Sequence, residues 1–439
     1  MTHVIPFGQR SNHSAQPESP AWSPLTRIAF RFTFTYLALS VWFWIFEFAD
    51  KSTALVARPY QALWRPFAQW AAWHVFHWSG PVEPNFVCDT RYLYALLACF
   101  LAASALIAAV WSVWDRKQGS YLELDRWMRT LLRYSLAYLL LHYGMDKVFL
   151  LQFPAPGLAR LTERFGDYSP SSLMWAFIGS SLTYTVFGGV AEVLAALLLL
   201  FRRTSTFGAL IGFAVMFNVT VMDFSYDVAV KMFCLNILLM ASYLILPDVG
   251  RLLNFFILNR ATEPAALPKM LGGRLDRPLG RLIKVAIILF LLVPLTVRDW
   301  KNYRSTGAGA PLTPLYGLYE VKDFTLDGVE HPPLLTDNVR WRYVILEEPH
   351  MVTLRKMDDS TSTYRMNLDP AQHSISVDAA GETVDKSVLV LTSDGTDRFA
   401  LKGTWGGVPV AAELKRIDRS NFMLVNRGFH WINERPFVR

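Results

Sequence analysis

Residues 92–113 read YLYALLACFLAASALIAAVWSV and contain no Asp, Glu, Lys or Arg. The hydrocarbon core of a bilayer requires about 20 consecutive apolar residues from a spanning α-helix. Inside lipid, the backbone groups of such a segment must bond to one another, and a helix of this length satisfies them. The stretch therefore predicts a transmembrane helix.

Six other apolar runs are long enough, or nearly so, to span a membrane, and they cover residues 28–46, 130–151, 173–201, 204–222, 228–246 and 282–297. The run 173–201 is unusually long and contains Gly179, Gly188 and Gly189, so the sequence leaves open whether it forms one straight helix. The composition agrees with a membrane protein: 52% of residues are hydrophobic and 18% are charged, against about 25% charged in soluble proteins. We expect an α-helical polytopic bundle of about seven transmembrane helices.

Lys and Arg are distributed unevenly between alternate loops. The N-terminus and the loops on its side of the predicted spans hold fifteen, and the loops on the opposite side hold five. Loops rich in Lys and Arg face the cytoplasm. We therefore predict an inner (cytoplasmic) membrane protein with a cytoplasmic N-terminus and the segment after residue 298 outside. Residues 1–27 are polar and lack the apolar core of a signal peptide, which predicts a disordered cytoplasmic tail.

The pattern changes after residue 298. Short apolar runs follow at 342–346, 351–354, 364–368, 375–377, 388–391, 399–401 and 408–414. They are separated by turn signals such as Asp394-Gly395 and Gly406-Gly407. Strands at short, regular spacing predict an antiparallel β sandwich or barrel over residues 299–439. The three cysteines are far apart and include no C-x-x-C pair, which argues against a disulfide framework or a redox dithiol.

The two N-terminal spans fall within residues 28–122, and the loop between them carries an aromatic stripe at helical spacing: Leu63, Phe67, Trp70, His74 and His77. This pattern predicts a helix over 54–78 that lies in the outer membrane interface. His74 and His77 are one turn apart and could share a metal ion with Glu83 or Asp89. Histidines beside tryptophan in an interface are more often only amphipathic, so these two are the weak candidates for a metal site.

Ionisable groups at membrane depth are costly and mark functional sites. His142 and Asp146 are four residues apart and therefore share one helix face, while Glu192 is close to the middle of its predicted span. We expect a set of polar residues to converge on the outer half of one bundle: His142, Asp146, Lys147, Gln152, Asp167, Glu192, Asn218, Asp223, Tyr226, Asp227 and Lys231.

Two interpretations of this polar set are open. In the first, Lys147, Lys231 and the neighbouring aspartates neutralise one another and fix the ends of helices. In the second, the set forms a pocket that binds the head of an amphiphile such as a quinone. There Asp146 or Asp227 accepts a proton, Lys231 or His142 polarises an oxygen, and Glu192 passes protons deeper.

Several motifs occur in a fixed order across these spans: Arg133-Tyr134, YGMDK at 143–147, QFP at 152–154, GDYSP at 166–170, FGGVAE at 187–192 and YDVAVK at 226–231. Over residues 123–250 the set resembles the DoxX family of four-helix membrane proteins. The segment GFHWINE at 428–434 is similar to the ending of a longer variant of that family. The resemblance implies a four-helix core, a link to quinones, and a redox partner subunit. Residues 251–298 would add a cytoplasmic loop and a seventh span.

Two function hypotheses follow. The first is a quinone-interacting subunit of a membrane redox system. One histidine in a span cannot supply both axial ligands of a membrane haem, and no flavin or Fe–S motif is visible, so a partner subunit would carry the electrons. The second is a non-enzymatic membrane scaffold, or a lipid- or small-molecule-binding protein, that presents the β domain. The expected partner is membrane lipid, and the absence of a basic stripe argues against nucleic acid.

Overall fold

The computed structural model describes residues 21–47, 54–82, 88–264, 278–313, 315–369, 374–378, 387–393, 395 and 397–435. The chain divides into two compact units. The first combines residues 1–141 with 194–280, and the second combines residues 142–193 with 281–439. Helices α4 (Leu122–Val148) and α7 (Leu182–Leu199) contribute residues to both units.

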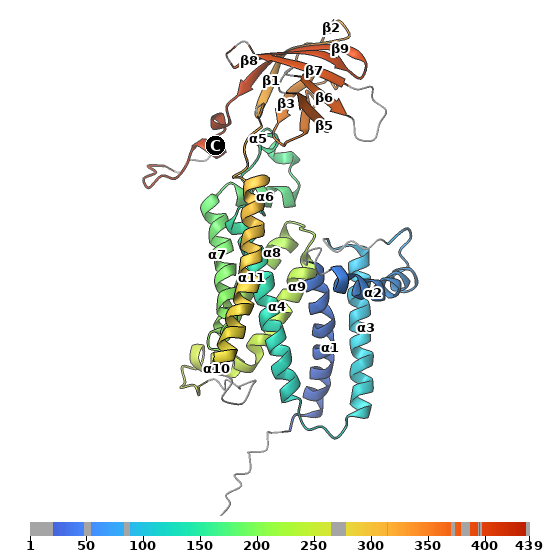
Figure 1. Ribbon diagram of the computed structural model, residues 1–439, viewed down its shortest axis with the longest axis vertical. Helices are drawn as coiled ribbons and strands as arrows, with labels where there is room; N and C mark the ends of the chain where they lie inside the picture. The colour runs from blue at the N-terminus through green and yellow to red at the C-terminus, as the bar shows by residue number, and fades with distance from the viewer. Residues whose placement is uncertain are drawn as a thin grey trace, which may run out of the picture. The chain divides into compact units, whose positions relative to one another are not determined.

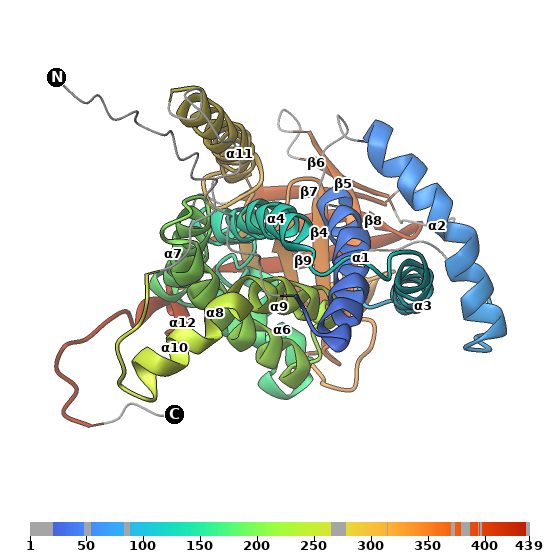
Figure 2. The same ribbon diagram turned by 90° about the horizontal axis from the view of Figure 1, so that it is seen from below.

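The first unit is helical. Besides the beginning of α4 and the end of α7, it contains α1 (Pro24–Glu47), α2 (Ala54–His74), α3 (Arg91–Trp114), α8 (Ser205–Ser225), α9 (Lys231–Ile245), the 3-10 turn η2 (Leu246–Asp248) and α10 (Val249–Phe256). Helices α1 and α3 lie side by side, and α2 crosses their ends (Figures 1 and 2). Thus α2 is a helix, as predicted, and it exposes an apolar stripe that includes Leu63, Phe67 and Trp70. Its location in the membrane interface stays a prediction.

The second unit joins helices to a β domain. Its helices are the end of α4, the beginning of α7, α5 (Leu158–Leu161), η1 (Phe165–Asp167), α6 (Pro170–Gly179), α11 (Pro278–Ser305), η4 (Arg419–Asn421) and α12 (Met423–Asn426). Close to its end, α11 packs against the end of α4, because Phe149 contacts Trp300 and Tyr303 with ring centroids 6.3 and 6.4 Å apart.

Five stretches of the described residues are long and apolar enough to cross a membrane: Pro24–Ile45, Arg91–Trp114, Leu182–Leu199, Ser205–Ser225 and Lys231–Phe256. The chain is a multi-pass membrane protein. Helices α4 and α11 have 27 and 28 residues but carry more charge and are not among the five. That they cross the membrane, giving seven spans, stays a prediction.

The run 173–201 forms two helices, α6 and α7. At the break, Gly179 packs so closely on the Pro154 carbonyl that a Cβ would lie 2.2 Å from that oxygen. The Thr185 hydroxyl donates to the Ile178 carbonyl over 2.8 Å. This contact gives a carbonyl at the end of α6 a partner that the interrupted helix does not provide.

The C-terminal domain is a closed barrel. Eight strands follow one another in chain order, each antiparallel to the next, and β1 pairs with β9 to close the sheet. The strands are β1 (Gly317–Leu326), β3 (Trp341–Leu346), β4 (Met351–Lys356), β5 (Thr361–Asp369), β6 (Ser374–Asp378), β7 (Ser387–Ser393), β8 (Arg398–Trp405) and β9 (Val408–Ile417). The two-residue strand β2 (Val329–Glu330) extends the end of β1. Of the two predicted alternatives, sandwich and barrel, the structure is a barrel.

Apolar side chains fill the barrel interior, as the strict alternation along its strands requires. On β7, Leu389 and Leu391 are buried, whereas Val388 and Val390 face outward. Seventeen buried residues form this core, including the three aromatic residues Tyr319, Phe324 and Trp341, and the partly buried Trp405 packs against it. Closure removes the exposed sheet edges through which open sheets aggregate.

Within the second unit, the barrel is attached to the loop between α4 and α6 by the short helix α5. Leu158 of α5 packs with Leu318 and Ile345 of the barrel. The Glu347 carboxylate accepts hydrogen bonds from the backbone N–H groups of Leu158 (2.9 Å) and Ala159 (3.3 Å). The carboxylate therefore satisfies donors at a helix start that have no partner inside the helix.

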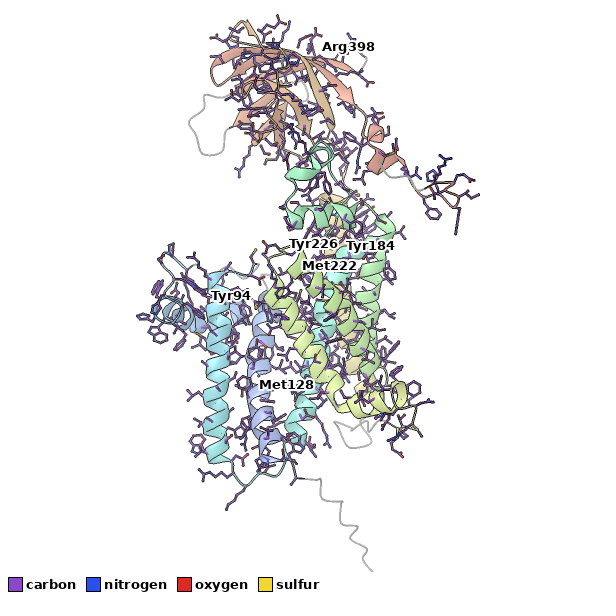
Figure 3. The ribbon with its side chains drawn as sticks, turned by 180° about the vertical axis from the view of Figure 1, so that it is seen from behind. Tyr94, Met128, Tyr184, Met222, Tyr226 and Arg398 are labelled. Carbon is purple, nitrogen blue, oxygen red and sulfur yellow. The ribbon has the colours of Figure 1, made fainter. Side chains whose placement is uncertain are left out.

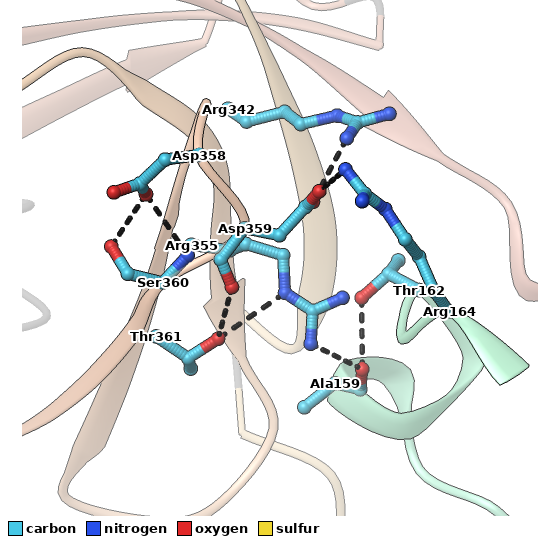
Figure 4. A network of polar contacts seen from close by, with 9 residues as sticks. All are labelled: Ala159, Thr162, Arg164, Arg342, Arg355, Asp358, Asp359, Ser360 and Thr361. Carbon is cyan, nitrogen blue, oxygen red and sulfur yellow. Dashed lines mark hydrogen bonds and ion pairs between the residues drawn. The ribbon is translucent and has the colours of Figure 1, made fainter. Parts of the chain in front are cut away.

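Charged groups around β4 and β5 complete this attachment (Figure 4). Asp359 bonds to both Arg164, from the loop, and Arg342, from β3. Arg355 donates to the Ala159 carbonyl over 3.4 Å. Polar bonds and an apolar contact thus hold the barrel to the loop.

The alternation on β7 gives a direct test of the barrel. Replacing Leu389 by Ala removes a buried side chain and is expected to destabilise the barrel by about 2–5 kcal/mol. Replacing its outward-facing neighbour Val388 by Ala is expected to change stability by no more than about 0.5 kcal/mol. Tryptophan fluorescence during denaturation of the detergent-solubilised protein measures both, and equal losses would contradict the inward register of Leu389.

Candidate functional site

The candidate site of the second unit begins where α4 and α7 approach closely. A Cβ on Gly144 would lie 2.9 Å from the Gly189 carbonyl oxygen, and one on Gly189 would lie 2.6 Å from the Gly144 carbonyl oxygen. Only glycine fits at both positions, as at close crossings of membrane helices in general. The two backbones are therefore in contact, which brings side chains one turn further along each helix within bonding distance.

Those side chains are Lys147 and Glu192. The Lys147 ammonium donates to both carboxylate oxygens of Glu192, each over 2.8 Å. Both residues are buried, and the ammonium also lies 5.8 Å and 5.9 Å from the ring centroids of Tyr143 and Phe153. Removing one member of such a buried pair leaves an uncompensated charge and costs about 3–5 kcal/mol.

A second group of charges lies on α4, at residues that precede Lys147, and on α11. Arg298 donates to Asp146 Oδ1 over 2.9 Å and to Asp299 Oδ1 over 2.6 Å. It also contacts His142 Nδ1 over 2.9 Å. Because the guanidinium can only donate, the contacted nitrogen of His142 is an acceptor and the ring is neutral. One cation therefore bridges two carboxylates and an imidazole.

Asp299 is the least exposed charged residue of this group, with an exposed fraction of zero. Its Oδ2 accepts no hydrogen bond from any described residue. The carboxyl group of Asp146 bonds to the same guanidinium, that of Arg298.

The charges of these groups do not balance. Lys147 and Glu192 neutralise each other. Arg298 faces two carboxylates, Asp146 and Asp299, beside a neutral imidazole. Among the described residues, this group therefore holds one carboxylate more than the Arg298 cation balances.

Other predicted residues lie in the first unit. The Lys231 ammonium pairs with Asp227 over 2.9 Å, and the Asp227 side chain is 86% exposed. Tyr226 lies in the same turn, one helical turn after Met222 (Figure 3). Asp89 accepts from the N–H groups of Lys231 (2.8 Å) and Met232 (3.1 Å), and it thereby caps the start of α9. This capping role was not expected from the sequence.

The predicted set therefore separates into groups. His142, Asp146, Lys147, Gln152, Asp167 and Glu192 belong to the second unit, and Asn218, Asp223, Tyr226, Asp227 and Lys231 belong to the first. Of the former, Asp167 is exposed, and the amide Oε1 of Gln152 is buried without a described donor. Asp223 is buried and Asn218 is exposed. That all these residues line one pocket stays a prediction.

Sequence reasoning missed the two residues of α11 that complete the site, Arg298 and Asp299. The predicted last span ended at residue 297, whereas α11 continues to Ser305. An Arg-Asp pair placed directly after an apolar run, and followed by aromatic residues, was the available signal.

The weak metal candidates are not brought together with a ligand set. The His74 ring stacks on Trp70 at 5.2 Å, and its Nδ1 contacts the Trp70 carbonyl oxygen at 3.0 Å. Asp89 caps α9, and Glu83 lies outside the described residues. Among the residues that the structure describes, no three His, Cys, Asp or Glu side chains form a cluster suited to a metal ion.

Part of the chain is similar to a known protein. The chain is 28% identical over 133 residues to the uncharacterized protein YwoB of Bacillus subtilis, a match that covers 28% of this chain and 79% of YwoB. No protein-family model matches the chain, and no solved structure matches it. The resemblance to the DoxX family therefore stays a prediction.

The two adjacent glycines of α7 provide a matched pair of variants. Gly189→Ala inserts a methyl group against the α4 backbone and is expected to cost about 1–3 kcal/mol. A Cβ on Gly188 would meet only the Lys147 side chain, at an ordinary 3.8 Å. Gly188→Ala should therefore be neutral or stabilising by up to about 1 kcal/mol. Thermal unfolding in detergent measures both, and a stable Gly189→Ala protein would rule out the close crossing.

Proposed function

We propose that this chain binds the polar head of a membrane-dissolved amphiphile of the quinone class and exchanges one proton with it. The observation that carries the proposal is the bridge of Arg298 between Asp146 and Asp299, with one carboxylate oxygen buried and without a donor. Ion pairs that only fix helix ends do not require a surplus carboxylate.

The residues present suit a quinone head. In its reduced form such a head donates hydrogen bonds from two hydroxyl groups, and in its oxidised form it accepts hydrogen bonds at two carbonyl oxygens. Asp299 Oδ2 and Gln152 Oε1 are buried acceptors without a described donor, so each suits a hydroxyl group. The Arg298 and Lys147 cations suit a carbonyl oxygen. The quinone would supply the redox chemistry, and electrons would pass through a partner subunit.

The protein's own part is to hold and release the proton. Asp146 and Asp299 share it, and Arg298 keeps the second carboxyl group ionised by donating to both. His142 orients the guanidinium through its ring nitrogen. The Lys147–Glu192 pair is neutral and holds α4 against α7. Because Asp146 directly precedes Lys147, this bond also fixes the position of Asp146.

A second candidate function is a membrane scaffold that presents the barrel. The specific observation in its favour is the attachment through Glu347 and Asp359, which holds the barrel to the helical loop. The interior of the barrel is packed with apolar side chains, so its binding surface would be its outer wall. In this function the buried charges are structural.

Titration of the purified protein with a short-chain ubiquinone, followed by tryptophan quenching and thermal unfolding, distinguishes the two functions. Binding is expected in the wild type and is expected to weaken about tenfold or more in Asp299→Asn, since a charge-assisted bond of about 1.5–3 kcal/mol is lost. Asp125→Asn is the matched control, because it removes an arginine-bonded carboxylate from α4, in the first unit and outside the proposed site.

Absence of any response to the quinone in the folded wild type would remove the quinone proposal. Equal binding by the wild type and Asp299→Asn would remove the role of the carboxyl pair. A loss of stability in Asp299→Asn without a change in quinone binding would favour the scaffold.

A further inference from the structure

The segment that follows the last strand, β9, is fixed to the base of the barrel at its beginning. Arg419 of η4 donates to the Pro156 carbonyl over 3.0 Å. Phe422 packs on the cluster in which Leu158 of α5 meets the barrel. The segment is therefore held by the loop between α4 and α6, within the second unit.

That loop lies next to the end of a membrane helix. Pro154, two residues before Pro156, packs its carbonyl on Gly179 at the break between α6 and α7. Two residues of extended chain span at most about 7 Å. Helix α7 is one of the stretches that are long and apolar enough to cross a membrane. The segment after β9 therefore begins close to the point where α7 leaves the bilayer.

After α12 the chain closes into a short loop, residues 427–433, which we call the C-terminal hook. Arg427 donates to the Asn433 side-chain oxygen over 2.8 Å, and the Asn433 amide donates to the His430 carbonyl over 3.1 Å. Gly428 has a φ of +65°, a conformation that glycine adopts without strain. The hook therefore has a defined shape.

The hook presents three large apolar side chains to its surroundings. Phe429, Trp431 and Ile432 are 77%, 91% and 79% exposed, and Trp431 is the most exposed large apolar side chain that the structure describes. The rings of Phe429 and Trp431 pack edge to face, with centroids 5.1 Å apart. Figure 1 shows the segment after α12 extending away from the barrel. Adjoining exposed apolar side chains mark an interaction site.

The composition around the hook is typical of a membrane interface. Met423, Leu424 and Val425 of α12 are also exposed. Residues 423–435 contain two arginines and one glutamate, so their formal charge is +1. Tryptophan and other amphipathic rings collect at headgroup depth, and segments that combine them with arginine lie in the interface. The chemistry therefore suits a lipid surface.

The bilayer is also the neighbour that the hook meets without diffusion. Trp431 follows α12 by five residues, which span at most about 18 Å. The headgroup region on each side of a bilayer is about 5–8 Å thick. Because the hook begins beside the end of α7, it can reach that region, and its tether makes the binding intramolecular. A separate protein would have to be captured from solution.

We propose that the C-terminal hook inserts Phe429, Trp431 and Ile432 into the lipid interface beside the break between α6 and α7. The exposed Arg435 would then lie among the lipid phosphates. The Lys and Arg distribution predicts that this is the outer leaflet. Insertion would hold the base of the barrel to the bilayer. The inference does not use the carboxyl pair and does not depend on the function proposed above.

Photocrosslinking to lipid tests the insertion. Full-length protein is reconstituted in vesicles of phosphatidylcholine and phosphatidylglycerol that contain a phosphatidylcholine with a diazirine near the carbonyl end of one acyl chain. After irradiation and trypsin digestion, mass spectrometry is expected to find lipid adducts on the peptide that begins at Gly428. Residues 323–340 should remain free of adducts. This peptide carries the exposed Leu334 and Leu335, which follow β2 at the opposite end of β1 from Leu318.

Two variants separate insertion from general contact with lipid. Trp431→Asp is expected to lower the adduct yield on the hook peptide about tenfold or more, because a large aromatic surface is lost and a charge is placed in the interface. Leu335→Asp is the matched control, because it makes the same replacement at another exposed apolar side chain, and it should leave the yield unchanged. Both side chains are exposed, so the unfolding temperature should not change in either variant.

Two results would overturn the proposal. One is the absence of adducts on the hook peptide of the wild type, and the other is an equal yield in the wild type and Trp431→Asp. Hydroxyl-radical oxidation of Trp431 in the same vesicles then identifies the alternative. Rapid oxidation would show that the hook stays in water, where it is free for a protein partner. Slow oxidation without adducts would show that the hook folds onto the chain itself.

Discussion

The bond of one guanidinium to two carboxylates is the interaction on which the second unit depends. Arg298 and Asp299 belong to α11, and Asp146 and His142 belong to α4. Removing one member of such a group would leave a poorly solvated charge without its partner and would destabilise the protein. The same bond therefore fixes α11 to α4, and α11 leads through a short segment into the first strand of the barrel.

In the second unit, the described residues hold one carboxylate more than their cations balance, at Asp146 and Asp299 beside Arg298. In the function proposed above, a proton balances it. The other buried ions, such as Lys147 with Glu192, are paired within the chain. Unbalanced burial is a stronger sign of a ligand than burial alone.

The sequence predicted the features that depend on local periodicity. Five of the seven apolar runs correspond to helices long and apolar enough to cross a membrane, and the alternation of residues such as Leu389 and Leu391 located most strands. The first strand was missed because charged residues interrupt its pattern and a bulge between Val321 and Asp323 shifts the alternation. The position of His142 beside Asp146 was also predictable, because residues four apart share a helix face.

Long-range contacts could not be predicted in the same way. No periodicity pairs Lys147 with Glu192, because that bond depends on two glycines that meet across two helices. The break after Gly179 depends on the carbonyl of Pro154, a residue from another segment. The predicted boundary between the last span and the β domain fell between Arg298 and Asp299, because the apolar run stops before them, although α11 continues to Ser305.

The most direct measurement of the central claim is the infrared spectrum of the carboxyl groups in the purified protein at neutral pH. We expect a band from one protonated carboxylic acid that shifts in heavy water and disappears in Asp299→Asn. A spectrum in which every carboxyl group is ionised at neutral pH, or a band unchanged in that variant, would contradict the shared proton.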